Sequence, residues 1–142
     1  MTYRIVVGVD GSAHSEAALR WSLDEAAARG GSVTALLSWQ VPFLSIPGAF
    51  DREELEQTYK NYVNEIVSAV APSPPVPLAT VVAEGDPAES LITAARDAEL
   101  LVVGTRGRSP FAGLVLGSVS QRCAAAARCP VVLVRQDEEQ SG

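Results

Sequence analysis

The chain has little of the residue types that build metal centres, disulfide frameworks and catalytic triads. It has two cysteines, Cys123 and Cys129, and a single histidine, His14. Two cysteines without clustered histidines make a poor zinc site. We expect both thiols to be reduced and partly buried rather than bridged. No Ser or Cys is placed to form a triad with His14, so we expect a surface or capping role for this histidine.

Positive charge and long apolar runs are also scarce. The chain has one lysine, Lys60, and 17 acidic residues give it a net charge of −6 and a pI of about 4.7. Such an acidic chain argues against general nucleic-acid binding, which needs a basic surface. No apolar run approaches the roughly 20 residues that span a bilayer, and the start, MTYRIVVGVDGS, lacks the pattern of a signal peptide. We therefore expect a cytoplasmic protein with no nucleic-acid or membrane partner.

What the chain does have is enough apolar material for one core. Hydrophobic residues make up 47% of its 142 residues, which is typical of a globular domain. We expect a single domain over residues 1–136. The remaining residues, 137–142, are polar and acidic, and we expect them to form a mobile tail.

Short apolar segments alternate with segments of helical periodicity. The expected strands are residues 3–9, 32–39, 78–84, 99–104 and 130–135, and the expected helices lie within residues 12–31, 52–70, 87–97 and 118–127. Apolar strands that lack a polar face favour a parallel sheet covered on both sides. The pattern predicts an α/β fold with a doubly wound, five-stranded parallel sheet and helices on both faces.

A glycine-rich loop follows the fourth expected strand. Four of the eleven glycines fall between Val102 and Gln121, and the next helix is expected to begin at Ser118. The unpaired N–H groups and the positive dipole end of that helix make an anion site. The hydroxyls of Ser118 and Ser120 and the charges of Arg106 and Arg108 would suit a phosphate, although both arginines could equally be solvated. Ser118 and Gln121 also have the spacing of a capping box.

A second loop, Val9 to Ser12, follows the first strand. If strands one and four are neighbours, the two loops face each other across one crevice, where doubly wound sheets bind ligands. Asp10 could contact a ligand there, or it could simply close a turn or cap a helix. The familiar phosphate motifs are absent: neither G-x-x-x-x-G-K-[ST] nor G-x-G-x-x-G after the first strand occurs.

The pattern that is present is Gly104-x2-Gly107-x9-Gly117-Ser118. It resembles the ATP-binding motif of the universal stress protein family, G-x2-G-x9-G-[ST], at every fixed position. The segments IVVGVDGS, GDPAESLI and CPVVLVR also resemble that family, so the likeness runs from about Tyr3 to Arg135 as a single copy. The resemblance implies a Rossmann-like fold of the adenine nucleotide alpha hydrolase type, with ATP as the ligand.

The resemblance also implies a role for each of twelve positions. Asp10 would accept hydrogen bonds from the ribose hydroxyls, and Trp39 would sit beside the adenine. Val9 and Ser12 would line the nucleoside end; Gly104, Gly107, Gly117, Ser118 and Ser120 would surround the phosphates; Thr105, Arg106 and Val119 would lie near them. Magnesium could bridge the phosphates, but Asp10 is not its obvious ligand, and a metal site is left open.

Three functions remain open at this point. The first is a nucleotide-dependent stress or regulatory protein that acts through dimer or partner contacts, with no catalytic residue and at most a weak ATPase activity. The second is an ATP-hydrolysing enzyme or a cyclic-AMP-binding protein that uses the same site, and the third is a dimeric interaction module without nucleotide. Members of the family commonly dimerise through the fifth strand, so the resemblance implies a homodimer contact at Val131, Val132, Leu133 and Val134. The alternative is an edge covered by the acidic tail.

Overall fold

The computed structural model describes residues 2–41, 48, 50–106 and 116–136. Within them the chain alternates strand and helix from end to end. The strands are β1 (Arg4–Gly8), β2 (Ser32–Trp39), β3 (Leu78–Glu84), β4 (Leu100–Gly104) and β5 (Val131–Val134), and the helices are α1 (Ala13–Arg29), α2 (Arg52–Val70), α3 (Pro87–Ala94) and α4 (Ser118–Ala126).

All five strands form one parallel sheet in the order β3-β2-β1-β4-β5. In the register, Val6 of β1 lies between Thr34 of β2 and Leu101 of β4. The predicted fold is confirmed, and so is the neighbourhood of strands one and four. From β1 the chain adds β2 and β3 on one side, and it then crosses to the other side of β1 to add β4 and β5. The direction of winding therefore reverses between β1 and β4.

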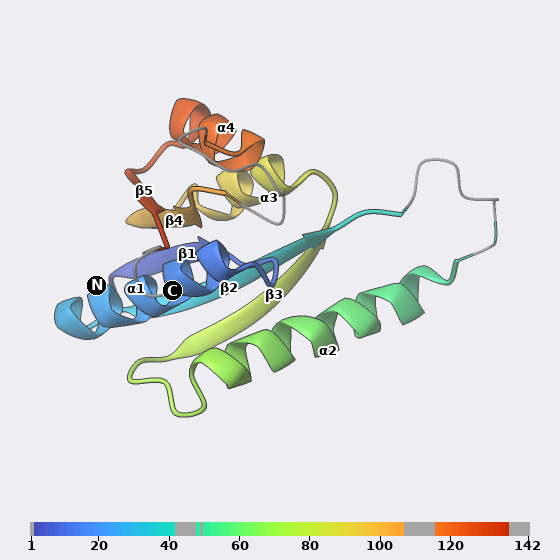
Figure 1. Ribbon diagram of the computed structural model, residues 1–142, viewed down its shortest axis with the longest axis horizontal. Helices are drawn as coiled ribbons and strands as arrows, with labels where there is room; N and C mark the ends of the chain where they lie inside the picture. Colours follow the sequence, from blue (N-terminus) through green and yellow to red (C-terminus); the bar gives the residue numbers. More distant parts are fainter. Residues whose placement is uncertain (1, 42–47, 49, 107–115, 137–142) are drawn as a thin grey trace.

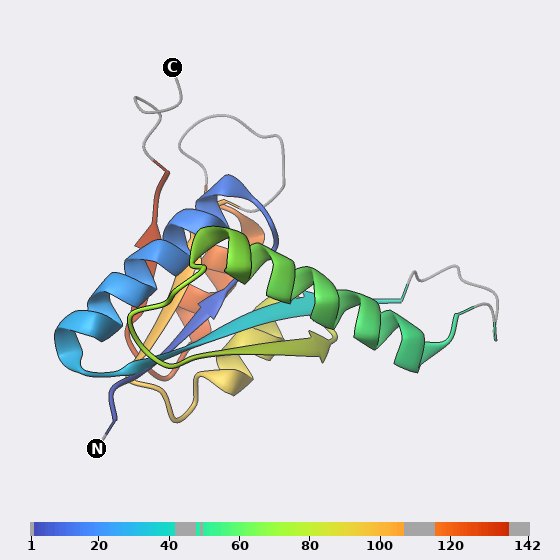
Figure 2. The same ribbon diagram turned by 90° about the horizontal axis from the view of Figure 1, so that it is seen from below.

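Helices cover both faces of the sheet. Figure 1 shows α3 and α4 on one side and α1 and α2 on the other, and Figure 2 shows α2 lying along β2 and β3. Successive residues of β1 point to opposite faces: Ile5 and Val7 pack with α1 and α2, whereas Val6 packs with α3 and α4. Each side chain is at most 1% exposed, which explains why β1 has no polar face.

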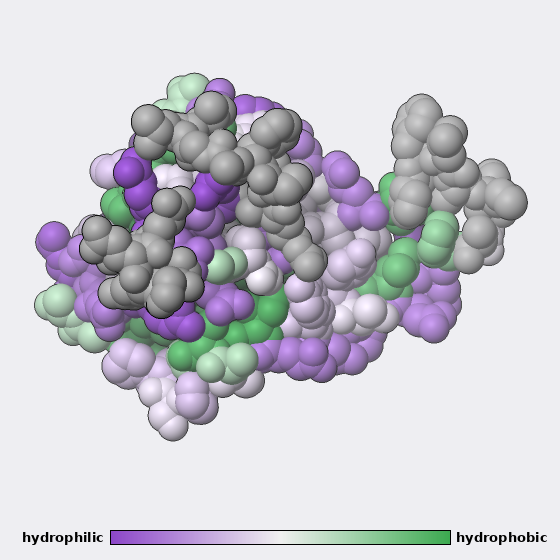
Figure 3. Space-filling model, viewed as in Figure 1, coloured by the Kyte–Doolittle hydropathy of each residue, from purple (hydrophilic) through white to green (hydrophobic). Residues whose placement is uncertain are grey.

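The molecular surface follows from this two-sided packing. In Figure 3, hydrophobic residues come to the surface between α1 and α2, whereas hydrophilic residues cover much of the remaining face. No helix in the described part of the chain combines the length and the apolar character needed to cross a bilayer.

Two helix ends differ from the expectation. Helix α3 ends at Ala94 rather than near Asp97, because Ala95 leaves helical geometry and the chain closes short turns through Arg96 N to Thr93 O and Ala98 N to Ala95 O. Helix α4 begins at Ser118 as expected, but its cap is Gly117, which makes no side-chain hydrogen bond. The predicted capping box is therefore wrong: the Gln121 side chain donates instead to the Leu116 carbonyl at 2.7 Å.

Both cysteines are free, as expected. Cys123 is fully buried between α4 and the sheet, and burial raises the pKa of its thiol to about 11. At neutral pH this thiol is protonated, and it acts as a small apolar side chain in the core.

Candidate functional site

A cavity of about 280 Å³ lies at the carboxyl ends of β1, β2 and β4. This is the place where doubly wound sheets leave a crevice, because the connections from neighbouring strands run to opposite faces. Eight of the twelve predicted site residues line it: Val9, Asp10, Gly104, Arg106, Gly117, Ser118, Val119 and Ser120. The two loops thus meet as the sequence predicts.

The β1 loop holds Asp10 in a fixed orientation. Oδ1 of Asp10 accepts a hydrogen bond from Ser12 N at 2.9 Å, and Asp10 N donates to Ser15 Oγ at 3.2 Å. Asp10 thus closes a turn, while its other carboxylate oxygen has no hydrogen bond within the described residues and remains available to a ligand. Ser12 does not line the cavity; it caps α1 by accepting a hydrogen bond from Ser15 N at 3.2 Å.

The β4 loop packs tightly against the start of α1. A Cβ on Gly104 would lie only 2.8 Å from the backbone carbonyl carbon of His14, so a residue with a side chain would push α1 away. His14 is half-buried and bridges several elements, which corrects the expected surface or capping role. Its Nδ1 lies 3.1 Å from Thr105 Oγ1 and its Nε2 lies 3.4 Å from the Arg106 guanidinium, and Gln136 N donates to Nδ1.

Thr105 therefore points toward His14, and it is not among the residues that line the cavity, whereas Arg106 lines it. Gly107 and Arg108, which the sequence also places in this loop, lie outside the described residues. Thr105 thus holds His14 and the start of α4, and its expected position near the phosphates stays a prediction.

Helix α4 starts from a hydrogen-bonded junction with β4. Gly117 N donates to Thr105 O at 2.8 Å, and the buried Ser120 hydroxyl lies within hydrogen-bond distance of both Thr105 O and Gly117 O. The next N–H groups, from Ser118 to Ser120, have no acceptor inside the helix. They border the cavity together with Arg106, which makes this end of the cavity suited to an anion.

Trp39, like Ser12 and Thr105, is a predicted site residue that does not line the cavity. Its indole is 6% exposed and stacks on Tyr59 of α2, with ring centroids 5.5 Å apart. Side chains alternate along β2, so Trp39 faces α2 while Leu36 and Ser38 face the cavity on the side of α3. Trp39 therefore does not line the cavity, and its contact with adenine stays a prediction.

Residues that sequence reasoning missed complete the other end of the cavity. Leu36 and Ser38 of β2 and Pro87 and Leu91 of α3 line it, and all but Ser38 are apolar. The alternation of β2 puts Leu36 and Ser38 on the opposite face from Trp39, but it does not tell which face borders the cavity. The contribution of α3 had no such signal, because a helix that starts 48 residues after Trp39 can be placed only by the tertiary fold.

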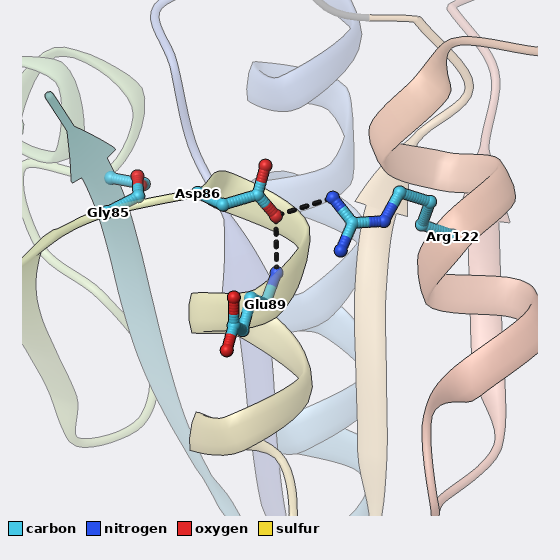
Figure 4. Close-up of polar contacts among 5 residues, drawn as sticks. Gly85, Asp86, Glu89 and Arg122 are labelled. Carbon is cyan, nitrogen blue, oxygen red and sulfur yellow. Dashed lines mark hydrogen bonds and ion pairs between the residues drawn. The ribbon is translucent and has the colours of Figure 1, made fainter.

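An ion pair fixes α3 to α4 beside the cavity (Figure 4). Oδ2 of Asp86 accepts a hydrogen bond from Glu89 N at 3.0 Å, and Arg122 of α4 donates to the same oxygen at 2.6 Å. The hydrogen bond from Glu89 N holds the pKa of the Asp86 carboxyl below its usual range, and Arg122 adds to this lowering. Asp86 thus caps α3 and ties it to the helix whose start borders the cavity.

Replacing Asp86 by alanine is expected to lower the free energy of unfolding by about 1–2 kcal/mol at pH 7, because the cap and the ion pair are both lost. The lowered pKa of the folded state means that the charged carboxylate stabilises the fold, and that this contribution disappears as the pH falls below about 4. Urea unfolding of both proteins at pH 7 and pH 3 measures the effect. An Asp86→Asn variant, which can still cap the helix, should cost less; an Asp86→Ala effect of equal size at both pH values would contradict the assignment.

Metal ligands are not gathered in the described residues: no three His, Cys, Asp or Glu side chains lie together in a way that could hold an ion. Among the described residues that line the cavity, Asp10 supplies the one carboxylate. The chemistry of the cavity is thus an apolar end, a carboxylate in the middle and a helix start with an arginine at the other end.

A parallel sheet with this strand order and a cavity at its point of reversal defines a doubly wound α/β protein. The chain belongs to the universal stress protein family, whose family model matches residues 1–135. Universal stress protein Rv2005c of Mycobacterium tuberculosis is 35% identical to it over 133 residues, which are 93% of this chain and 45% of that protein. The chain therefore spans about half the length of such curated relatives.

Solved structures give the same result for the fold. Universal stress protein UspA from Lactobacillus plantarum is 24% identical, covers 95% of this chain and 99% of its own, and has a TM-score of 0.78. A universal stress protein solved in complex with cAMP is 26% identical, with a TM-score of 0.70 over 95% of this chain and 98% of that chain. The first likeness shows the fold alone, and the second is a relative that holds an adenine nucleotide.

Proposed function

We propose that this universal stress protein binds ATP in the cavity between the β1 and β4 loops. The supporting observation is that three different chemistries meet in one cavity in the order that a nucleotide requires. Leu36 and Leu91 offer an apolar surface to the base, Asp10 offers a carboxylate to the ribose, and the start of α4 offers N–H groups to the phosphates. The relative that was solved with cAMP makes cyclic AMP the second candidate for the same site.

The proposed role is regulatory binding in the cytoplasm rather than catalysis. Phosphoryl transfer needs a base or water-positioning group and cationic or metal clamps on the phosphates. Within the described residues, the cavity lining holds one carboxylate and no lysine. We therefore infer at most slow hydrolysis, and an output that passes through dimer or partner contacts.

The edge strand β5 is the proposed homodimer contact. It lies at one end of the sheet order, and its residues Val131 to Val134 are half-buried in the single chain. An apolar edge strand leaves unpaired backbone groups that pair readily with a second strand. The two-fold contact of Val131, Val132, Leu133 and Val134 would cover them.

The test of ATP binding is Gly117→Ala and Gly117→Val. Gly117 has φ −66° and ψ 162°, values that any residue adopts, so both variants should fold. A side chain at the cap would keep the phosphates from the N–H groups of α4, and we expect the affinity for ATP to fall roughly tenfold for alanine and further for valine. Mass spectrometry of small molecules that co-purify with each protein, followed by calorimetry with ATP and with cyclic AMP, measures this loss.

Ala124→Val is the matched control, because it adds the same side chain to the exposed face of the same helix. We expect this variant to bind ATP as the wild type does. Wild-type protein that binds neither nucleotide would refute the proposed function, and unchanged affinity in Gly117→Val would refute the position of the phosphates.

A further inference from the structure

We propose that Ser38 determines base specificity, by accepting a hydrogen bond from the exocyclic amine of adenine. This inference rests on the proposed function, and it assigns a task to a residue that the glycine motif does not include. It predicts that the cavity selects a 6-amino purine over a 6-oxo purine such as hypoxanthine or guanine.

The first step is the place of Ser38 in the cavity. Ser38 lies on the cavity face of β2, two residues after Leu36, and the other described groups at that end are the apolar side chains of Pro87 and Leu91. Strand β1 separates β2 from β4, so Ser38 is two strand spacings, roughly 10 Å, from the strand that leads to the anion-binding end. That separation leaves room for a ribose at Asp10 and puts the base beside Ser38.

The second step is the direction of the Ser38 hydrogen bond. Ser38 Oγ lies 2.6 Å from the carbonyl oxygen of Gly85, in the turn between β3 and α3. A carbonyl oxygen can only accept, so the single hydroxyl hydrogen of Ser38 is committed to this bond. What Ser38 then presents to the cavity is the lone-pair side of its oxygen, which acts as an acceptor.

The third step is the consequence for a purine. An acceptor in an otherwise apolar end favours a ligand that brings a donor, and it disfavours one that brings another acceptor. Adenine carries an amino group at C6, whereas hypoxanthine and guanine carry a carbonyl oxygen there. The hydrogen bond to the Gly85 carbonyl prevents the Ser38 hydroxyl from rotating to donate to the C6 oxygen of such a base. The fold thus favours adenine over a 6-oxo purine.

The experiment compares ATP with ITP, which carries a carbonyl oxygen in place of the amino group at C6 and a hydrogen on N1, by calorimetry on the wild type and on Ser38→Ala. We expect the wild type to prefer ATP. In Ser38→Ala the affinity for ATP should fall about threefold to tenfold, while the affinity for ITP stays constant or rises. Ser38→Thr keeps a hydroxyl and should keep the preference for ATP.

Ser90→Ala is the matched control. Ser90 lies on α3 near Gly85, with its Oγ 3.9 Å from where a Cβ of Gly85 would be, but it does not line the cavity. We expect the same ratio of ATP to ITP affinity as in the wild type. Circular dichroism and urea unfolding of each variant identify any loss of fold. If Ser38→Ala is unfolded, the ratio of ATP to ITP affinity in the wild type carries the test.

The outcomes separate the two proposals. If Ser38 only holds β2 to the turn before α3, ATP and ITP affinities fall by the same factor in Ser38→Ala, and the specificity role is overturned while ATP binding stands. A wild type that binds ATP and ITP equally also overturns it. A wild type that binds neither nucleotide refutes both the proposed function and the role of Ser38.

Discussion

Replacing Gly11 by alanine is expected to lower the free energy of unfolding by about 2–4 kcal/mol, with most of the nucleotide affinity lost as well. Gly11 has φ +85°, which L-residues adopt only at a cost. In addition, a Cβ there would lie 2.3 Å from the hydroxyl oxygen of Tyr62 on α2. The loop must move to relieve the backbone strain and the close contact with Tyr62, and this loop orients Asp10. Urea unfolding and calorimetry with ATP measure the two effects.

Two further variants separate the causes. Gly30 has φ +67° and nothing within 4 Å of its would-be Cβ, so Gly30→Ala reports the cost of positive φ alone and should be milder. Tyr62→Phe removes the hydroxyl, so adding Gly11→Ala to this variant should cost about 1 kcal/mol less than in the wild type. Equal costs in the two backgrounds would show that the contact with Tyr62 does not matter.

Replacing Asp10 by asparagine is expected to weaken ATP binding about tenfold to a hundredfold, with little effect on stability. The amide oxygen can still accept from Ser12 N and close the turn. The second carboxylate oxygen, which would accept hydrogen bonds from the ribose hydroxyls, is replaced by an amide NH2 group that can only donate. Calorimetry with ATP and with 2′,3′-dideoxy-ATP, which lacks those hydroxyls, measures the interaction: affinity for the dideoxy compound should be nearly equal in both proteins.

Asp24→Asn is the matched control for this experiment, because Asp24 is exposed on α1 and its replacement changes the net charge by the same amount. We expect no change in ATP affinity there. A loss of affinity in Asp10→Asn that is equally large for the dideoxy compound would place Asp10 away from the ribose.

The sequence predicted the fold well because the signals for it are local. Apolar runs such as that around Val6 and the helical stripe of α2 are visible within a dozen residues, and their alternation leaves few topologies. The meeting of the two loops at Asp10 and Gly117 followed from the same topology and from the glycine spacing.

The residues that were misassigned depend on contacts that are distant in the sequence. Whether Trp39 or Ser38 faces the cavity depends on which helix covers which face of β2, and residue spacing does not give that. The contact between His14 and Thr105 joins residues 91 positions apart. The cap of α4 is Gly117 rather than Ser118, because the Gly117 carbonyl accepts the first hydrogen bond of the helix from Gln121 N.

The backbone N–H and carbonyl groups of Thr105 link two separate parts of the fold. Its N–H donates to Val134 O of the edge strand β5, and its carbonyl oxygen accepts from Gly117 N, where α4 begins. One residue therefore joins the outermost strand to the end of the cavity that α4 borders. A displacement of β5 or of the start of α4 would thus alter the backbone hydrogen bonds of the same residue.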